Sequence, residues 1–427
     1  MKTRSCPRKA IRKTIVGAVS ALGFLSAIVP SLRAQATPTP QNWAQFGGES
    51  AHPDSLRDYL TRLRSALVAV QEHPEQKQPL TLSAQVSAES RTGVRRLRIR
   101  DFQFLSDGSR SIGEFNLGPG SWPTVVGVLG SAVAQDFLMQ AALKGIPLDE
   151  LEVVFTSQPG SAPSKSGTRV TYPRNLVYTA YVVSPASDAE LEALRQTVER
   201  VSPVLNLVSQ PQTIPHGKLF HSPTAATRAD KTFEGLREFI AEKQASYQGA
   251  KPPEGPSRFA TKATGRPGEP SLRAHVKVAG GTGIRHIRTD TSNFQIIHDS
   301  PRYLAGHDLG PVAEEHILGV MITCLTHIYE MRAASEQVVL DTLELEVEAT
   351  LTPRIGSTGT PPRYQDIRYS VYIGSPESKE RIERLQQSVE ATCPIYNMLK
   401  DPQEIRGSVV RGPLKRPRDQ KTKGRRD

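Results

Sequence analysis

The sequence predicts two tandem copies of one domain, each combining β-strands with a long apolar helix. From residue 102 to residue 149, paired residues recur 192 positions later without a gap. A period this long indicates a duplicated domain rather than a solenoid of short repeats. The recurring pairs are Phe102-Gln103 with Phe294-Gln295, Asp107 with Asp299, Arg110 with Arg302, Gly118-Pro119 with Gly310-Pro311, Ala141-Ala142 with Ala333-Ala334, and Leu148-Asp149 with Leu340-Asp341.

The organising element of the second copy is an apolar helix within residues 310–336. Apolar residues recur there at helical spacing, which predicts one buried stripe. Cys324 lies within the stripe, and Glu314 and Glu315 open the helix, where the helix dipole favours anions. The stripe residues are Ile317, Val320, Met321, Cys324, Ile328 and Met331.

The other elements of the first copy follow from periodicity and turn signals. Residues with period two predict strands, and amphipathic stretches predict helices. In chain order we expect a helix at 54–72, strands at 80–87 and 94–105, a glycine-rich loop at 106–121, a helix at 123–143, strands at 148–156 and 169–183, and a helix at 187–200.

Residues 1–36 read as an export signal. Seven Lys and Arg and no acid lie in this segment, residues 14–32 are mostly apolar and small, and Ala34-Gln35-Ala36 offers a cleavage site. The alternative is an uncleaved membrane anchor formed by residues 14–32. We therefore expect a bacterial protein that is exported to the periplasm or the extracellular space, with a mature chain that begins near Thr37.

The net charge of +11 comes from the two ends of the chain. Residues 411–427 carry eight Lys and Arg and two Asp, so the balance of residues 37–410 is −2. A nearly neutral body argues against nucleic acid as a partner. The expected segments are a signal peptide at 1–36, a linker at 37–50, a first domain at 51–212, a polar linker at 213–230, a second domain at 231–408, and a basic disordered tail at 409–427.

The repeat aligns the two copies and shows what the first one lacks. After export the chain keeps two of its three cysteines, Cys324 and Cys393, because Cys6 lies in the signal. Their first-copy counterparts are Ala132 and Ser202, and Glu314 and Glu315 align with Trp122 and Pro123. The joint loss of both sulfurs and both acids suggests that the two cysteines act as a unit.

At these residues each half resembles the OsmC/Ohr family of osmotically induced and organic-hydroperoxide-resistance proteins. The resemblance covers about residues 80–212 and 272–408, and the first copy is degenerate. The matching elements are Gly310-Pro311, Glu314 and Glu315, Cys324 on the central helix, and Cys393-Pro394. The resemblance implies an α+β fold with curved antiparallel sheets packed on long central helices. Because such proteins are intertwined homodimers, two tandem halves would form a pseudo-dimer within one chain.

The resemblance further implies a thiol peroxidase for organic hydroperoxides that needs a dithiol reductant and no metal or cofactor. Cys324 would attack the peroxide and Cys393 would resolve the sulfenic acid. A nearby arginine would keep Cys324 ionised, with an acid holding the guanidinium. The candidate arginines are Arg302, before the glycine loop, and Arg91, in an Arg-x-Gly turn. Glu314 and Glu315 are the candidate acids.

Other interpretations of the same residues stay open. Cys324 and Cys393 fit a static disulfide in an exported binding or scaffold protein, or inert thiols in the core. The glutamates fit helix capping as well as the orientation of an arginine. His327 fits a packed helix residue better than a base. We see no metal-ligand or phosphate-loop spacing.

Overall fold

The computed structural model describes most of the two repeated segments. The described residues are 55–73, 78–89, 92–108, 114–163, 169–227, 235–248, 272–289, 294–353 and 362–414. All of them belong to one compact unit, residues 46–427. The expected signal peptide, the linker 37–50, Arg91, Arg110 and residues 415–427 of the expected tail lie outside the described residues. The expected start of the tail at residue 409 is wrong, because residues 409–411 end a β-strand that pairs with the first half.

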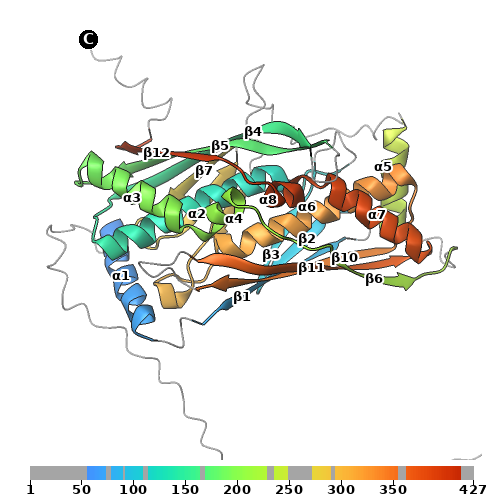
Figure 1. Cartoon of the computed structure of the whole chain (residues 1–427), viewed down its shortest axis with the longest axis horizontal. Coiled ribbons are helices and arrows are strands. Elements are labelled where there is room, and N and C mark those ends of the chain that lie inside the picture. Colours follow the sequence, from blue (N-terminus) through green and yellow to red (C-terminus); the bar gives the residue numbers. More distant parts are fainter. Residues whose placement is uncertain are drawn as a thin grey trace, which may run out of the picture. The chain divides into compact units, whose positions relative to one another are not determined.

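The two halves have the same order of helices and strands (Figure 1). The first half comprises α1 (Leu56–Glu72), β1 (Leu80–Ala88), β2 (Arg95–Ile99), β3 (Phe102–Ser106), α2 (Ser121–Lys144), β4 (Glu150–Pro163), β5 (Arg169–Val183), α3 (Asp188–Val201), α4 (Pro203–Ser209) and β6 (Lys218–Pro223). The second comprises α5 (Leu236–Tyr247), β7 (Leu272–Val278), β8 (Arg285–Thr289), β9 (Gln295–His298), the short helix η4 (Arg302–Leu304), α6 (Ala313–Glu336), β10 (Thr342–Thr352), β11 (Arg363–Ser375), α7 (Lys379–Thr392), α8 (Pro394–Lys400) and β12 (Ile405–Arg411).

The two six-stranded sheets are each assembled from both halves. Their orders are β3-β2-β1-β10-β11-β6 and β9-β8-β7-β4-β5-β12. The halves meet where β1 pairs with β10 and where β4 pairs with β7, both antiparallel. The α+β class is confirmed, and the sheets are mixed because β6 and β12 join them in parallel.

Two local expectations are wrong because strand pairing was not visible in the local pattern. Residues 213–230 were expected to be a polar linker, but they contain β6, which pairs with β11. The single strand expected at 94–105 is the hairpin β2–β3, with Arg100 at a positive φ of 51° in its turn. In both places one face of the strand is exposed and carries polar residues, so the hydrophobic pattern alone does not show where the strand begins and ends.

The long helices α2 and α6 pack against each other between the two sheets (Figure 1). Helix α2 covers β4, β7 and β8, and α6 covers β1, β2 and β10. By length and composition α2 could cross a membrane, but most of it is buried inside the protein, as expected for a core helix.

Equivalent glycines allow each helix to approach its sheet. A Cβ atom at Gly127 would lie 2.7 Å from a methyl carbon of Ile287, and one at Gly319 would lie 2.9 Å from a methyl carbon of Leu97. Both distances are too short for carbon atoms in contact, so a side chain here would push the helix away from the sheet. This close packing fixes the height of α6, and therefore of Cys324, above β2.

The shared sheets predict that neither half folds alone as a monomer. A polypeptide of residues 55–227 would lose β10 and β7, leaving the inner edges of β1 and β4 unpaired and the faces of α2 exposed. We expect residues 55–227 and residues 235–414 to be unfolded or self-associated when expressed separately. When co-expressed, they should form a one-to-one complex with a cooperative thermal transition.

Analytical ultracentrifugation and circular dichroism measure both properties. A cooperatively folded monomer of either half would contradict the shared-sheet arrangement.

Candidate functional site

The two thiols of the second half lie together in the core. Cys324 is in the middle of α6, and Cys393 is the residue between α7 and α8. Both are free thiols, and their side chains are 1% and 0% exposed. The fold therefore brings together two cysteines that lie 69 positions apart in the sequence.

The surroundings of Cys324 favour its thiolate form. Burial opposes ionisation, but the Cys393 thiol, the Ile395 N–H and the Ser121 hydroxyl donate hydrogen bonds to its sulfur, and Arg95 adds a positive charge. Together they lower the pKa of Cys324 below that of a free thiol. Burial raises the pKa of Cys393 well above its ordinary value, and the hydrogen bond to Cys324 adds to this effect. This is the asymmetry expected of an attacking thiol and its partner.

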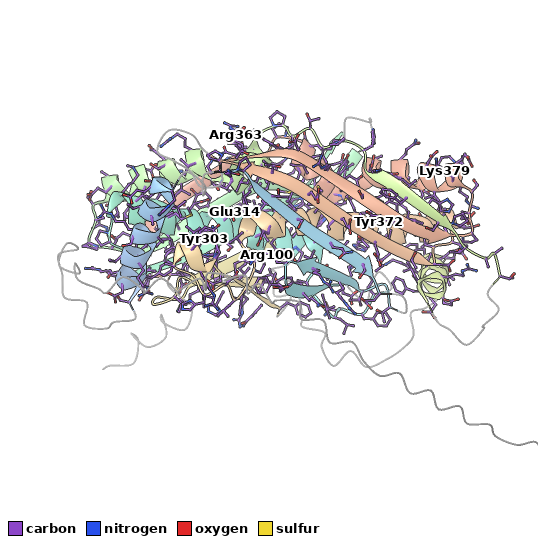
Figure 2. All side chains as sticks on the ribbon, turned by 90° about the horizontal axis from the view of Figure 1, so that it is seen from below. Arg100, Tyr303, Glu314, Arg363, Tyr372 and Lys379 are labelled. Carbon is purple, nitrogen blue, oxygen red and sulfur yellow. The ribbon has the colours of Figure 1, made fainter. Side chains whose placement is uncertain are left out.

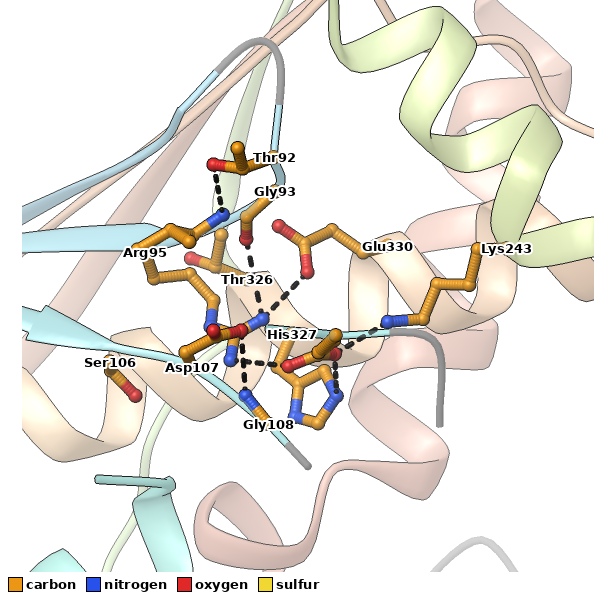
Figure 3. A network of polar contacts seen from close by, with 12 residues as sticks. Thr92, Gly93, Arg95, Ser106, Asp107, Gly108, Lys243, Thr326, His327 and Glu330 are labelled. Atoms are coloured by element: carbon orange, nitrogen blue, oxygen red, sulfur yellow. Dashed lines mark hydrogen bonds and ion pairs between the residues drawn. The ribbon is translucent and has the colours of Figure 1, made fainter. Parts of the chain in front are cut away.

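Arg95 links the two halves through a buried network of polar contacts (Figure 3). Its side chain is 1% exposed and comes from β2 of the first half. Nη1 donates to Glu330 on α6 at 2.8 Å, and Nη2 donates to Glu114 at 2.9 Å. A guanidinium can make both bonds at once because its N–H groups form a rigid fork.

Two further groups, Lys243 and His327, complete this buried cluster around Glu114. Lys243 of α5 donates to Glu114 Oε1, and His327 Nε2 lies 2.7 Å from the same oxygen. Burial lowers the pKa of His327 to about 4, so its ring is neutral at neutral pH. Burial raises the pKa of Glu330 to about 7, although the charges of Arg95 and Lys243 act in the opposite direction.

A cavity of about 240 Å³ lies beside the thiol site, with Ser121 in its wall. Apolar side chains form much of its wall, and Ser121 both lines the cavity and donates to Cys324. Thr323, the residue before Cys324 on α6, also lines it. The apolar wall residues include Leu97, Phe104, Leu105, Leu117, Pro119, Phe294, Ile296 and Val320.

The structure does not bring Glu314 or Glu315 to Cys324. Glu314 precedes Cys324 by ten positions on one helix, which is about 15 Å along its axis at about 1.5 Å per residue. Glu315 instead pairs with Arg100 at 2.8 Å. Arg302 is exposed and lines a second cavity together with both glutamates. Arg91 is outside the described residues, so its part in the site stays a prediction.

A second site, equivalent to the thiol site, contains Glu314. Arg285 occupies the position of Arg95: each follows a Thr-Gly-x turn, and each donates from Nη1 to its glycine carbonyl at 3.4 Å, Gly93 or Gly283. Near Arg285, Ser202 replaces Cys393 and bonds to Asp136, and the charges of Asp136 and Glu314 act on the guanidinium. The acid of the motif therefore belongs to the site that has no thiol.

Sequence reasoning missed Arg95, although a signal for it was present. In β2 the buried positions are 95, 97 and 99, so Arg95 is in phase with Leu97 and Ile99. The same phase recurs in β8, where Arg285 precedes Ile287. An arginine at an inward position of a strand is costly unless it is paired, and its recurrence in both copies marks it as part of the site.

Comparison with known families agrees with this geometry. Residues 306–406 match the family model OsmC, described as OsmC-like protein. Within the second half, residues 306–406 are similar to this family. The matched range contains Gly310-Pro311, Glu314, Cys324 and Cys393, so the resemblance inferred from these residues is confirmed there.

Solved structures with the same resemblance come from three bacteria. They are an OsmC-like protein from Mycoplasma pneumoniae (21% identity, TM-score 0.24, 30% of this chain and 89% of that one), an organic hydroperoxide resistance protein OsmC from Legionella pneumophila (13%, 0.23, 31% and 88%), and a putative osmotic stress induced and detoxification response protein from Psychrobacter arcticus (16%, 0.24, 30% and 88%). No curated protein matches this chain. Among its described residues, no three His, Cys, Asp or Glu side chains form a group suited to a metal ion.

The site predicts that Arg95 lowers the pKa of Cys324. Replacing Arg95 alone would leave Glu330 buried without its cation, whereas Glu114 keeps Lys243, so the test variant is Arg95→Gln combined with Glu330→Gln. We expect the pKa of Cys324 to rise by about one unit or more, since a neighbouring cation shifts a pKa by about that amount. Thiolate absorbance measured against pH reports it.

Arg285→Gln is the matched control, because Arg285 is equally buried in the equivalent turn but has no thiol beside it. A rise of the same size in both variants would show that the effect is general loosening of the core and not the charge of Arg95.

Proposed function

We propose that the protein is a thiol-dependent peroxidase that reduces organic hydroperoxides, with Cys324 as the attacking thiol and Cys393 as the resolving thiol. One observation carries the proposal: Cys324 and Cys393 are free thiols buried together in the core, and hydrogen bonding to Cys393, Ile395 and Ser121 and the charge of Arg95 lower the pKa of Cys324. The OsmC match over 306–406 supports a redox or peroxidase-like role for this segment.

The reaction uses two thiols and one peroxide. The Cys324 thiolate attacks a peroxide oxygen, an S–O bond forms, the O–O bond breaks, and the alcohol leaves after it takes up a proton. The Cys393 sulfur then attacks the Cys324 sulfenic acid, which forms a disulfide and releases water. An external dithiol supplies two electrons and two protons to restore both thiols.

The surrounding residues have separate parts in this scheme. Arg95 and the Ser121 hydroxyl stabilise the thiolate of Cys324 before attack. The 240 Å³ cavity holds the apolar body of the peroxide, because Leu105, Leu117 and Phe294 form part of its wall. Arg302, Arg91, Glu314 and Glu315 remain the family-based candidates, and Glu314 belongs to the equivalent site around Arg285.

The proposal includes a pseudo-dimer within one chain. In the thiol site Arg95 and Ser121 come from the first half, whereas Cys324 and Cys393 come from the second. This division is the one expected when two subunits of a dimer become two halves of one polypeptide. Only one of the two equivalent sites then keeps its thiols.

A structural disulfide in a non-enzymatic binding protein is the second candidate function. The near-complete burial of Cys324 and Cys393 favours it, because a structural bridge is shielded from reductants. The two functions differ in the reduction potential of the pair. A bridge that resists mild dithiols, with a potential below about −300 mV, supports the binding protein, and a higher potential supports the peroxidase.

The peroxidase predicts different effects for the two cysteines. Cys324→Ser should abolish the consumption of an organic hydroperoxide, because no other described thiol adjoins Arg95. Cys393→Ser should consume about one equivalent and stop at a sulfenic acid that a dimedone-type reagent traps. Stopped-flow kinetics and intact-mass spectrometry follow both. Consumption by Cys324→Ser at the wild-type rate would exclude the proposed role.

We further propose that the protein is exported to the periplasm or beyond and receives electrons from a dithiol there. The basic residues, apolar stretch and Ala34-Gln35-Ala36 site support this, although they lie outside the described residues. N-terminal sequencing of the protein from its native host should find a chain that begins near Thr37. An intact residue 1–36 segment on protein recovered from the cytoplasm would contradict export.

A further inference from the structure

A larger cavity lies at the site without thiols, next to Arg285 and Asp136. It encloses about 500 Å³, which is within the range of small-molecule sites. Its walls include the first turn of α6 with Glu314 and Glu315, and the helix α2 with Gln135 and Asp136. The starting residue of β1, Leu80, and the C-terminal part of β10, Leu351, also line it. The labels of Arg100, Tyr303 and Glu314 gather in one region of the molecule, and all three residues line this cavity (Figure 2).

Two buried oxygen atoms at one end of the cavity have no partner. Gln135 Nε2 donates to Glu314 Oε1 at 3.4 Å, which leaves Gln135 Oε1 and Glu314 Oε2. Within the described part of the chain neither atom has a hydrogen-bond partner, and their residues are 5% and 8% exposed. Unpaired buried acceptors are rare in folded proteins, so these two require an explanation.

Two arginines, Arg100 and Arg302, line the cavity together with four acidic residues, Asp136, Asp308, Glu314 and Glu315, so the excess of acids disfavours an anionic occupant. Arg100, which could bind a carboxylate, is already held by Asp308 at 2.7 Å and by Glu315 at 2.8 Å. The polar end therefore presents the carboxyl groups of Glu314 and Asp136 and the free oxygen of Gln135. The rest of the wall is largely apolar: Leu80, Met139, Val201, Pro203, Leu304 and Leu351.

We propose that this cavity binds a small amphipathic molecule whose hydrogen-bond-donating head, a hydroxyl or an ammonium group, meets Gln135 and Glu314. The head supplies the donors that the two free oxygens lack, and the apolar body lies against Leu80, Met139 and Leu351. The site is independent of the thiols, because Cys324 and Cys393 are not among its lining residues. The first copy has thus lost its thiols while its position in the fold has become a binding site.

Three probes of equal chain length test the chemistry on the full mature chain. Isothermal titration with octan-1-ol, octylamine and octanoate compares a hydroxyl, an ammonium and a carboxylate head. Saturable one-to-one binding of octan-1-ol or octylamine, with octanoate at least about tenfold weaker, supports the site, and the stronger of the two identifies its head group. Absence of saturable binding, or octanoate binding as tightly as the others, overturns it.

Gln135→Leu removes one free acceptor at almost constant volume. It should weaken the better probe about tenfold or more. Because it also removes the 3.4 Å hydrogen bond from Gln135 Nε2 to Glu314 Oε1, the melting temperature is measured alongside to show that the variant stays folded. Gln196→Leu, the same change at an exposed position of α3, is the control and should leave binding unchanged.

Cys324→Ser separates this site from the peroxidase: binding must be unaffected in that variant even where peroxide consumption is lost. Equal affinity of wild type and Gln135→Leu would contradict the assignment to this cavity.

Discussion

The ion pairs of Arg95 hold the two halves and the thiol site in one arrangement. This arginine comes from the first half, yet Glu330, one of its two carboxylate partners, is on the helix that carries Cys324. Removing a guanidinium from water is costly, and only well-placed partners offset that cost. Once Glu114, Glu330 and Lys243 enclose Arg95, the register of β2 against α6 cannot slip without leaving buried charges unpaired. The same charge that fixes this packing also favours the thiolate.

The duplicated fold lets one chain differentiate its two equivalent sites. Both keep an inward arginine after a Thr-Gly-x turn, because the turn and the strand phase belong to the fold. Their chemistry differs at the surrounding positions: Cys324 and Cys393 adjoin Arg95, whereas Ala132 and Ser202 occupy the equivalent positions on the side of Arg285. In a homodimer both sites would change together. A tandem chain removes that constraint, so one site can keep two thiols while the other has none and borders a cavity.

The sequence predicted much of the fold because the repeat supplied an internal alignment. The predicted helix 123–143 and the predicted strands 80–87 and 169–183 begin and end within two residues of the helix α2 and the strands β1 and β5 in the structure. The pairing of β6 with β11 and of β12 with β5 was not predictable. Parallel pairing joins segments that lie far apart in the sequence, so it leaves no local pattern. At the site, the partnership of Cys324 with Cys393 came from the family motif. Arg95 comes close to Cys324 only because β2 of the first half packs against α6 of the second half. The sequence pattern within one half does not show how the two halves pack.

The central claim is that Cys324 and Cys393 form one redox couple. Its most direct test is peptide mapping by mass spectrometry after the reduced protein receives one equivalent of an organic hydroperoxide. The proposed peroxidase mechanism predicts a new disulfide between the peptides of Cys324 and Cys393, with one equivalent of alcohol released. Two thiols that both remain free to alkylation while the hydroperoxide persists would contradict it.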